Sequence, residues 1–527
     1  MPSSTADKFC IIGAGSSGLA AAKNFLAAGI PFDCLERQDD VGGNWHYGSP
    51  ASSVYASTHL ISSKRLTEYT DFPMPEEWPE YPSHELALEY FRSYARRFGL
   101  YERIEFGTGV EQVEFVDRAQ QHLAAEGPRH VARGVSPWNE VEAVTRSPGG
   151  ATSSLDGVHD VAPAGASSEN SAKDQGLAPL ATRLGPSGAG KWRVTLTSGE
   201  VRYYRGVVIA NGHNWDPRWP EYPGTFAGEV VHSRQYKTPE LLRGRRVLVV
   251  GGGNSGCDLA VEAAIHAKRA LWSTRRAYPI LPKFFRGRPI DQCGEIALWL
   301  RAPLWARRLA GAAVSHLVLG PAWRTGVPRP DHKLFESHPI INSQIHHHVG
   351  HGNLELRPDI QQLDGSWVRF VDGREEEVDL IIYATGYRIT FPFIADEDRE
   401  PLLNWHDGAP RLFLHVFHPV RDDLFCAGLI QPASGQWGLV DLQMQLVARY
   451  VTARDAGATG AARFDAMKAR EAPDLGNGVK YLGTPRHAVE VEYYSYRKRL
   501  RKLIATMDRG TVRRSRSPWP VVLRNPH

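Results

Sequence analysis

The stretch FCIIGAGSSG, residues 9–18, decides the fold of this chain. A short apolar strand runs into a turn with glycine at three spaced positions, and an Ala-rich helix is expected to follow. The stretch RVLVVGGGNSG, residues 246–256, repeats this pattern. In each, glycine permits a tight turn, close approach to a pyrophosphate and contact between helix and strand, and the helix N-terminus favours the anion. The sequence therefore predicts two dinucleotide-binding units, whose glycines are Gly13, Gly15, Gly18, Gly251, Gly253 and Gly256.

The residue at the end of each second strand distinguishes the two nucleotides. Glu36 lies 23 residues after Gly13, where an acid accepts hydrogen bonds from a ribose 2′-OH and repels a 2′-phosphate. Arg275 lies 24 residues after Gly251, where a guanidinium suits a 2′-phosphate. We therefore expect FAD in the first unit, with NAD as the alternative, and NADPH in the second. The other residues predicted to contact the cofactors here are Ser16, Ser17, Arg37, Asn254, Ser255 and Ser273.

Two dinucleotides in one chain imply hydride transfer from a nicotinamide to a flavin. The five cysteines are scattered and form no C-x-x-C pair, which excludes a disulfide-reducing centre and favours a reducing compartment, the cytoplasm. The electrons must then pass to oxygen or to an acceptor protein.

Strands and helices alternate along the chain, which indicates an α/β architecture with parallel sheets. We expect a doubly wound FAD domain, discontinuous in sequence, into which a smaller NADPH domain is inserted. Residues 118–190, approximately, are rich in Ala, Gly, Ser and Pro without periodicity and are predicted to be a flexible insertion in a hairpin. The predicted parts are 1–211 (FAD domain, first part), 212–338 (NADPH domain), 339–507 (FAD domain, second part, and C-terminal helices) and 508–527 (basic tail).

Charge and hydropathy exclude several classes of protein. The formal net charge of +4 is carried by the basic tail, so the rest of the chain is balanced and nucleic-acid binding is not supported. The N-terminus lacks the pattern of a secretory signal, and we find no apolar run of about 20 residues that would span a membrane. Residues 296–319 come nearest, but arginines and a proline interrupt them. They are predicted to form two amphipathic helices.

Between the two glycine motifs lies FAGEVVHSRQYK, residues 226–237. It resembles the F-x-G-x-x-x-H-x-x-x-[YF] signature of flavin-containing monooxygenases, which are class B flavoprotein monooxygenases. It ends in Tyr236-Lys237, not in the Trp-Pro of type I Baeyer–Villiger enzymes. The resemblance covers the chain apart from the insertion and the tail, and is closer to soluble bacterial and plant-type members. Other segments similar to family motifs are Gly42–Trp45, Tyr69–Pro75, Ala210–Gly212, Ala384–Tyr387 and Gly428–Pro432.

The resemblance implies an NADPH-dependent monooxygenase. NADPH reduces FAD, O₂ adds to the reduced flavin to give a C4a-hydroperoxide, and the distal oxygen passes to a small organic nucleophile, usually an amine or a sulfide. Trp437 and Gln436 are expected to line the substrate side of the flavin, and His232 to be a structural residue at the domain junction. The residues that the resemblance adds to the cofactor site are Gly43, Asn44, Trp45, Gly386 and Gln443.

One segment departs from the family pattern. Residues 55–64, YASTHLISSK, align with Y-x-S-x-x-x-N-x-x-K, and the family's asparagine, which faces flavin N5 and the nicotinamide, falls on Ile61. Isoleucine offers no hydrogen bond. Either Ser62, His59 or Asn44 substitutes, or the backbone is shifted by one residue, or the peroxide is poorly held. Ile61, Ser62 and His59 are therefore the candidate catalytic positions, and we expect more H₂O₂ release than in a typical member.

Two alternative functions stay open. One is Baeyer–Villiger oxygenation of a ketone or oxidative decarboxylation of a 2-oxo acid. The other is an NADPH oxidase or redox-sensing flavoprotein without oxygen transfer, which Ile61 keeps open. The expected partners are a small-molecule substrate and O₂, with a homodimer left open. No metal site is expected, because three adjacent histidines, residues 346–348, cannot all face one ion.

Overall fold

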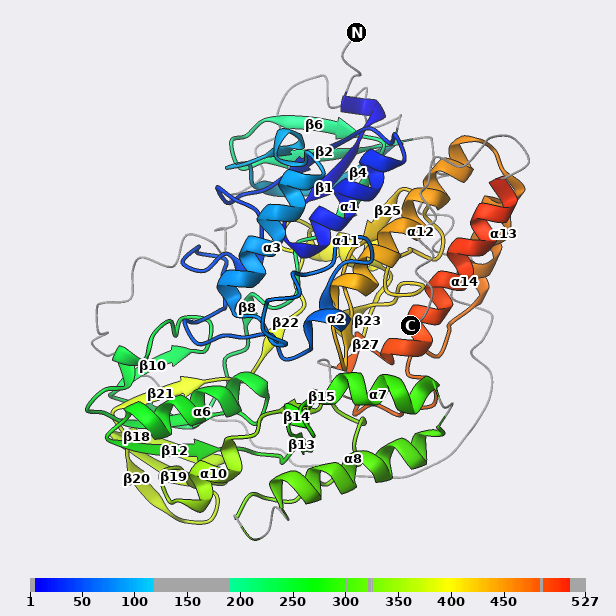
Figure 1. The fold of residues 1–527 in the computed structure, drawn as a ribbon. Helices are drawn as coiled ribbons and strands as arrows, with labels where there is room; N and C mark the ends of the chain where they lie inside the picture. The colour runs from blue at the N-terminus through cyan, green and yellow to red at the C-terminus, as the bar shows by residue number, and fades with distance from the viewer. Residues whose placement is uncertain are drawn as a thin grey trace, which may run out of the picture. The chain divides into compact units, whose positions relative to one another are not determined.

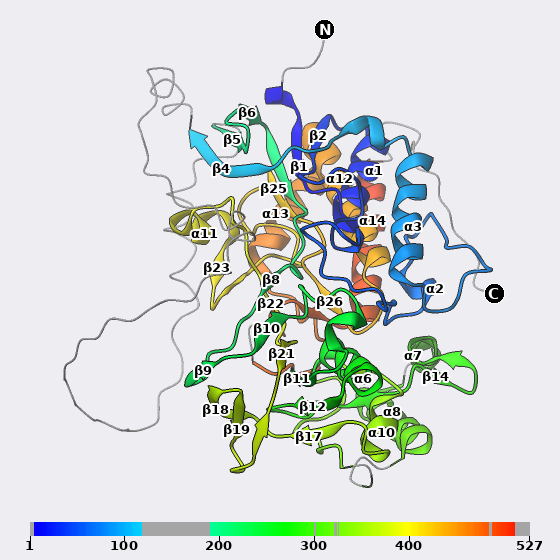
Figure 2. The same ribbon diagram turned by 90° about the vertical axis from the view of Figure 1, so that its left-hand side faces the viewer.

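The computed structural model describes residues 5–117, 190–299, 302–320, 324, 326–483 and 487–511 (Figures 1 and 2). Residues 115–190 form one unit and the remainder of the chain another. The predicted insertion lies outside the described residues except at its edge, between β4 (Val110–Asp117) and β5 (Gly190–Leu196). The predicted basic tail lies outside them beyond the end of α14 (Tyr493–Thr511).

The first parallel sheet is built around the stretch that opens the chain. Its order is β25–β7–β1–β2–β3, and every neighbouring pair is parallel. The central strand is buried along its whole length, as expected for a parallel sheet covered on both faces. The strands are β1 (Phe9–Ile12), β2 (Phe32–Leu35), β3 (Ile104–Glu105), β7 (Gly206–Ile209) and β25 (Leu424–Cys426).

The second parallel sheet repeats the first. Its order is β10–β21–β11–β12–β17, again with every pair parallel. The second domain extends beyond the boundary expected at residue 338. Strands β17 and β21 follow that residue in sequence and pair within this sheet. The strands are β10 (Glu229–His232), β11 (Arg246–Val250), β12 (Arg269–Ser273), β17 (Glu355–Arg357) and β21 (Leu380–Tyr383).

Helices and a small sheet cover the two parallel sheets. On the first, α1 (Ser16–Ala27), α3 (His84–Arg97) and α12 (Trp437–Asp455) share one large core (Figure 2). On the second, α6 (Asn254–His266) packs on one face. The other face packs against a four-stranded sheet of order β20–β19–β18–β9. The predicted α/β fold with two dinucleotide-binding units is confirmed. The strands of the small sheet are β9 (Gly224–Phe226), β18 (Ile360–Gly365), β19 (Trp367–Phe370) and β20 (Glu375–Glu377).

Two linkers connect the halves, and they pair with each other. β8 (Asp216–Pro217) and β22 (Tyr387–Arg388) are antiparallel, and the Arg388 guanidinium lies 3.1 Å from the Asp216 carboxylate. The carbonyl of Gly386, φ +86°, accepts a hydrogen bond from Arg218 N at 2.9 Å. The second linker therefore lies here and not near residue 338.

The segment nearest in composition to a membrane span forms two helices, as predicted. α7 (Ile290–Trp299) and α8 (Leu304–Leu319) are separated at Pro303, the N-cap residue of α8. Across the part of the chain that the structure describes, we find no helix that combines the length and the apolarity needed to cross a bilayer.

Candidate cofactor and active site

The turn after β1 requires glycine because backbone atoms occupy the space of a side chain. A Cβ atom on Gly13, φ +100°, would lie 2.9 Å from a carbonyl oxygen that follows β7, and one on Gly18 would lie 1.8 Å from the Gly13 carbonyl oxygen. Gly15 is the N-cap residue of α1, and no side chain caps this helix. The first-turn N–H groups, including those of Ser16 and Ser17, lack intrahelical partners and suit a pyrophosphate.

Glu36 follows β2 and lies directly beside this turn. Its side chain is buried, Oε2 accepts a hydrogen bond from Ala14 N at 2.6 Å, and Oε1 accepts one from Gln38 N at 2.9 Å. These donors fix the carboxylate, and each oxygen retains acceptor capacity for a ribose hydroxyl. The predicted ribose contact of Glu36 fits this geometry. The side chain of Arg37, which follows, is exposed.

Two distant segments close around the N-terminus of α1. A Cβ atom on Gly43, in η2 (Gly43–Trp45), would lie 3.0 Å from Gly15 Cα. One on Gly428, φ +74°, would lie 2.1 Å from Ser17 Oγ. Glycine at these two positions therefore keeps open a cradle at the N-terminus of α1, which a side chain at either position would fill. Its N–H donors, close backbone approach and neighbouring acid fit FAD.

The residues Gln443, Gln436 and Trp437, predicted at the flavin, each have neighbours within the protein. Gln443 is fully buried; its Oε1 accepts from Gly428 N at 3.0 Å and its Nε2 donates to Tyr496 Oη at 2.7 Å. Gln436 Nε2 donates to Gly428 O at 2.8 Å. Both glutamines therefore hold the Gly428 turn, with their amide groups bound to protein. Trp437 is 3% exposed and belongs to the core.

The other two flavin-side residues lie near the cradle but have protein partners. Asn44 Oδ1 accepts a hydrogen bond from Ser53 N at 2.6 Å. The Trp45 ring meets the Trp437 ring edge-on at 5.7 Å. Asn44 therefore shapes its own loop through its amide oxygen.

The second glycine turn reproduces the first. A Cβ atom on Gly251, φ +134°, would lie 2.3 Å from Ala384 O, and one on Gly256 would lie 2.1 Å from Gly251 O. Gly253 is the N-cap residue of α6, again without a side-chain cap. The Ser255 N–H lies in the first turn of α6, where a pyrophosphate would bind. The turn thus suits a second dinucleotide.

Asn254 and Ser273, which are predicted to contact the second cofactor, both make hydrogen bonds within the protein. Asn254 Oδ1 accepts from Ile341 N at 2.9 Å, so this side chain fixes the segment that follows residue 338. Ser273 is fully buried, and its Oγ donates to Pro358 O at 2.6 Å. Both side chains position the protein around the site.

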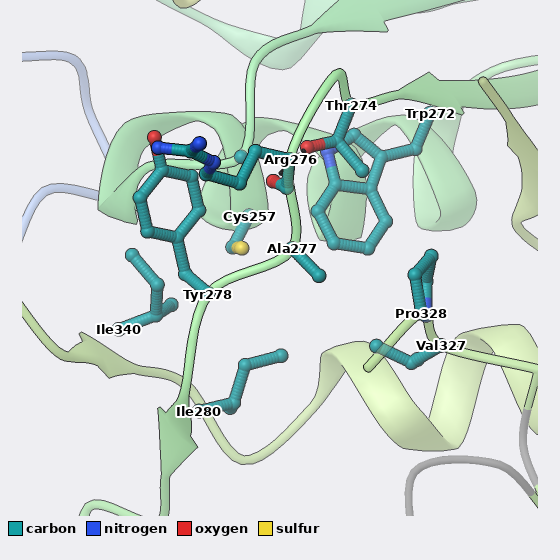
Figure 3. Close-up of a pocket in the computed structure, with 11 residues that line it drawn as sticks. Cys257, Trp272, Thr274, Arg276, Ala277, Tyr278, Ile280, Val327, Pro328 and Ile340 are labelled. Atoms are coloured by element: carbon teal, nitrogen blue, oxygen red, sulfur yellow. Dashed lines mark hydrogen bonds between the residues drawn. The ribbon is translucent and has the colours of Figure 1, made fainter. Parts of the chain in front are cut away.

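The end of β12 carries the predicted phosphate-binding residue. Arg275 is exposed and forms no hydrogen bond or ion pair within the described part of the chain. Arg276 Nε lies 2.9 Å from Asp331 Oδ2. The same turn borders the pocket in Figure 3. The remaining residues that line this pocket are Gly252, Cys257, Trp272, Thr274, Ala277, Tyr278, Ile280, Val327, Pro328 and Ile340.

The segment that contains Ile61 is anchored on both sides of that residue. Ser62 Oγ lies 2.8 Å from Thr67 Oγ1, so this hydroxyl already has a partner. His59 is exposed, and its Nδ1 lies 2.8 Å from Ser57 O. Lys64 Nζ donates to three backbone carbonyls of the 69–78 loop region at 2.6–3.1 Å. Ser62, His59 and Asn44, the three proposed substitutes for the asparagine, therefore each have a hydrogen-bond partner in the protein.

Asp291 was not predicted, yet it contacts this segment from α7. Its Oδ2 accepts from Ser63 N at 2.7 Å and lies 3.4 Å from Ser434 Oγ. Burial raises the pKa of the Asp291 carboxyl, although hydrogen bonds from Ser63 and Gln292 oppose the shift. In sequence, Asp291 is one acid at the start of an amphipathic helix, and nothing there indicates its distant partners.

The family-like signature contacts the Ile61 segment through Glu262, a second residue that was not predicted. Glu262, in α6, accepts hydrogen bonds from Tyr236 Oη and from Ser57 Oγ. Lys237 Nζ donates to Ser52 O and Val54 O at 2.9 and 3.0 Å. An acid inside the apolar run VEAAI was the available sequence signal.

His232 lies in this signature as the structural residue that we expected. It is completely buried at the end of β10, and burial lowers the pKa of its imidazole to about 4. Its Nδ1 accepts a hydrogen bond from Arg234 N at 3.2 Å, and its ring packs edge-on against Tyr387 in the second linker. A neutral, buried imidazole fixes the junction between the halves.

Comparison with known proteins agrees with this arrangement. The profile of the "FMO-like: Flavin-binding monooxygenase-like" family matches residues 6–124 and 181–506, leaving out most of the predicted insertion. Flavin-containing monooxygenase 5 of Rattus norvegicus is 29% identical over 454 residues, which are 83% of this chain and 72% of that protein. Dimethylaniline monooxygenase [N-oxide-forming] 2 of Oryctolagus cuniculus is 28% identical over 465 residues, 84% and 73% of the respective chains.

Solved structures share the fold at lower identity. S-allyl-L-cysteine S-oxygenase from Allium sativum superposes with a TM-score of 0.54 at 19% identity, covering 97% of this chain and 94% of that one. Cyclohexanone monooxygenase in its rotated conformation superposes with a TM-score of 0.62 at 17% identity, covering 96% and 99%. With the family match over most of its length, the chain belongs to the flavin-binding monooxygenase-like family and is an FAD-dependent, NADPH-consuming monooxygenase.

Proposed function

We propose that the protein inserts one oxygen atom of O₂ into a small organic substrate that carries a nucleophilic nitrogen or sulfur. Bound FAD, reduced by NADPH, supplies the activation of O₂ and the transfer of one atom, and the other atom leaves as water. The observation that carries the proposal is the signature at residues 226–237, which ends in Tyr236-Lys237. It contacts the Ile61 segment where Ala56 N donates a hydrogen bond to Lys237 O at 2.9 Å. The names of the rabbit N-oxide-forming relative and the Allium S-oxygenase support the same substrate class.

In this proposal each cofactor part has a protein counterpart. The N-terminus of α1 holds the FAD pyrophosphate, Glu36 accepts hydrogen bonds from its ribose, and the N-terminus of α6 holds the NADPH pyrophosphate. Arg275 binds the 2′-phosphate. Ile61 excludes water beside the reacting centre, and Lys64 keeps its segment in place by binding three carbonyl groups. The protein thereby contributes orientation and dryness.

Ketone oxygenation and 2-oxo-acid decarboxylation are less well supported. Both need a reacting oxygen with negative charge, which a nearby cation would stabilise. Lys64 is occupied by backbone carbonyls, and the side chain that reaches Ser63 is the carboxyl of Asp291. An acid at this position favours transfer to a soft, neutral nucleophile.

Ile61 supports a second proposal, that part of the NADPH consumed yields H₂O₂. The Ile61 side chain has no hydrogen-bonding group, and the hydroxyl of the neighbouring Ser62 already has a protein partner. A polar group that steadies the activated oxygen is therefore lost, and Ile61→Asn should restore it.

The test is turnover under ¹⁸O₂ with a sulfide, a tertiary amine and a ketone, while NADPH loss and H₂O₂ are recorded together. We expect one ¹⁸O atom in a sulfoxide or an N-oxide, and a smaller H₂O₂ share in Ile61→Asn than in the control Ser62→Ala. A labelled lactone with no labelled sulfoxide or N-oxide would establish the ketone reaction. NADPH loss matched fully by H₂O₂ with every substrate would establish an oxidase.

A further inference from the structure

The turn that follows β12 meets the second glycine loop. Ile12 pairs with Leu35 and Val250 with Ser273, so Thr274 holds the position that Glu36 holds in the first unit. A Cβ atom on Gly252 would lie 2.6 Å from Thr274 Oγ1. The side chains of Arg275 and Arg276, which follow Thr274, therefore lie where a nucleotide ribose would bind.

The second arginine of this turn is paired with an acid from a distant loop. Arg276 Nε lies 2.9 Å from Asp331 Oδ2. Asp331 Oδ1 lies 2.7 Å from His332 Nδ1, and His332 Nε2 lies 2.6 Å from Ser337 Oγ. The His332 side chain is 3% exposed, so it holds the carboxylate in a fixed position.

The Asp331 carboxylate is ionised at neutral pH. The hydrogen bond with His332 lowers its pKa most, and the charge of Arg276 acts in the same direction. Figure 3 shows Arg276 and Tyr278 bordering the same pocket, and the Tyr278 ring lies 5.7 Å from the His332 ring. The acid is therefore part of an ordered arrangement beside the turn.

We infer that Asp331 sets the affinity and the selectivity of the second site for a nucleotide 2′-phosphate. The inference rests on the proposed binding of NADPH by this unit. A 2′-phosphate must compete with Asp331 for Arg276, and the two anions repel each other. A fixed carboxylate is also the group that accepts hydrogen bonds from a ribose 2′-OH. Asp331 therefore narrows the preference for NADPH over NADH and leaves Arg275 as the main phosphate ligand.

The experiment is calorimetric titration of the FAD-loaded protein with 2′,5′-ADP, which carries the 2′-phosphate, and with 5′-AMP, which lacks it. Asp331→Asn keeps the oxygen that faces His332 and removes the charge. We expect about threefold tighter binding of 2′,5′-ADP, the size of a competing exposed ion pair, and no tighter binding of 5′-AMP. Adding Arg276→Met should reduce the gain, because the part that comes from competition for this guanidinium is lost. Asp396→Asn, an exposed acid paired with Arg399, is the matched charge control.

Unchanged affinity for 2′,5′-ADP in Asp331→Asn overturns the inference, as does an equal gain in Asp396→Asn. The underlying NADPH assignment is tested separately with Arg275→Ala. If that variant binds 2′,5′-ADP as tightly as the parent protein does, the assignment fails and the inference with it. A loss in Arg275→Ala together with no gain in Asp331→Asn leaves the assignment standing and refutes only the role of Asp331.

Discussion

Replacing Glu262 should loosen the contact between the family signature and the Ile61 segment. Glu262 is 8% exposed in α6 and accepts hydrogen bonds from the hydroxyls of Tyr236 and Ser57. These two donors belong to different halves of the molecule. In Glu262→Ala both lose their acceptor, but they are not affected equally.

The size of the effect follows from the burial of each donor. Tyr236 is fully buried, so its hydroxyl is left unsatisfied at a cost of about 1–3 kcal/mol. Ser57 is exposed and regains a hydrogen bond to water, so its share is below about 1 kcal/mol. We expect a total loss of about 1–4 kcal/mol for Glu262→Ala. The loss for Glu262→Gln should be smaller, because its amide oxygen still accepts one hydrogen bond.

Thermal unfolding of the FAD-loaded protein checks this value. A loss of about 1–4 kcal/mol corresponds to a fall in Tm of roughly 2–15 °C for a cooperative domain of about 150–250 residues. Glu240→Ala is the control, because Glu240 is exposed and lies 3.7 Å from Arg243. Equal Tm values for Glu262→Ala and Glu240→Ala would refute the reasoning, and so would a larger fall in Ser57→Ala than in Tyr236→Phe.

Three further predictions concern buried groups. Burial lowers the pKa of His232 from 6.5 to about 4. The neutral imidazole therefore contributes its full stability above the unfolded-state pKa, and up to about 3 kcal/mol of stability is lost as pH falls toward the folded-state pKa. Tm should decline less steeply with falling pH in His232→Gln, and an identical profile would contradict this. Gly18→Ala should abolish FAD binding, because its Cβ would lie 1.8 Å from a backbone carbonyl; a purified variant with stoichiometric flavin absorbance would contradict this. Lys23→Met removes the ammonium 2.9 Å from the fully buried carboxylate of Asp441 and should cost about 3–5 kcal/mol; denaturant titration should show a much larger loss than in the exposed control Lys502→Met.

The local sequence was sufficient to predict a binding site wherever the residues of that site lie within one strand, one turn and one helix. The glycines at 13, 15 and 18 and at 251, 253 and 256 predicted both dinucleotide-binding units. At Gly13, Gly18, Gly251 and Gly256, the backbone clashes that require glycine arise within the turn or with the end of the adjoining strand. Glu36 and the free guanidinium of Arg275 also lie where the strand pairing places them. Spacing alone is enough in such cases, because the strand, the turn, the helix and the second strand of such a unit follow one another directly in sequence.

Side-chain roles that depend on distant partners were not predictable in this way. Gln443 and Trp437 match family motifs, but their neighbours in the folded chain occupy the amide group and bury the ring. The boundary at residue 338 was too early, because β17 and β21, which follow that residue in sequence, pair with β12 and β11 in the second sheet.

The sequence by itself determined the fold class, the two glycine turns and the family of this protein. Only the tertiary structure decided which charged groups are free. Asp291, Glu262 and Asp331 each reach a partner far away in sequence, and composition or periodicity carries no record of such a pairing. Whether a charge binds a cofactor, holds a loop or competes with a phosphate depends on which opposite charge or hydrogen-bond donor folding brings within reach.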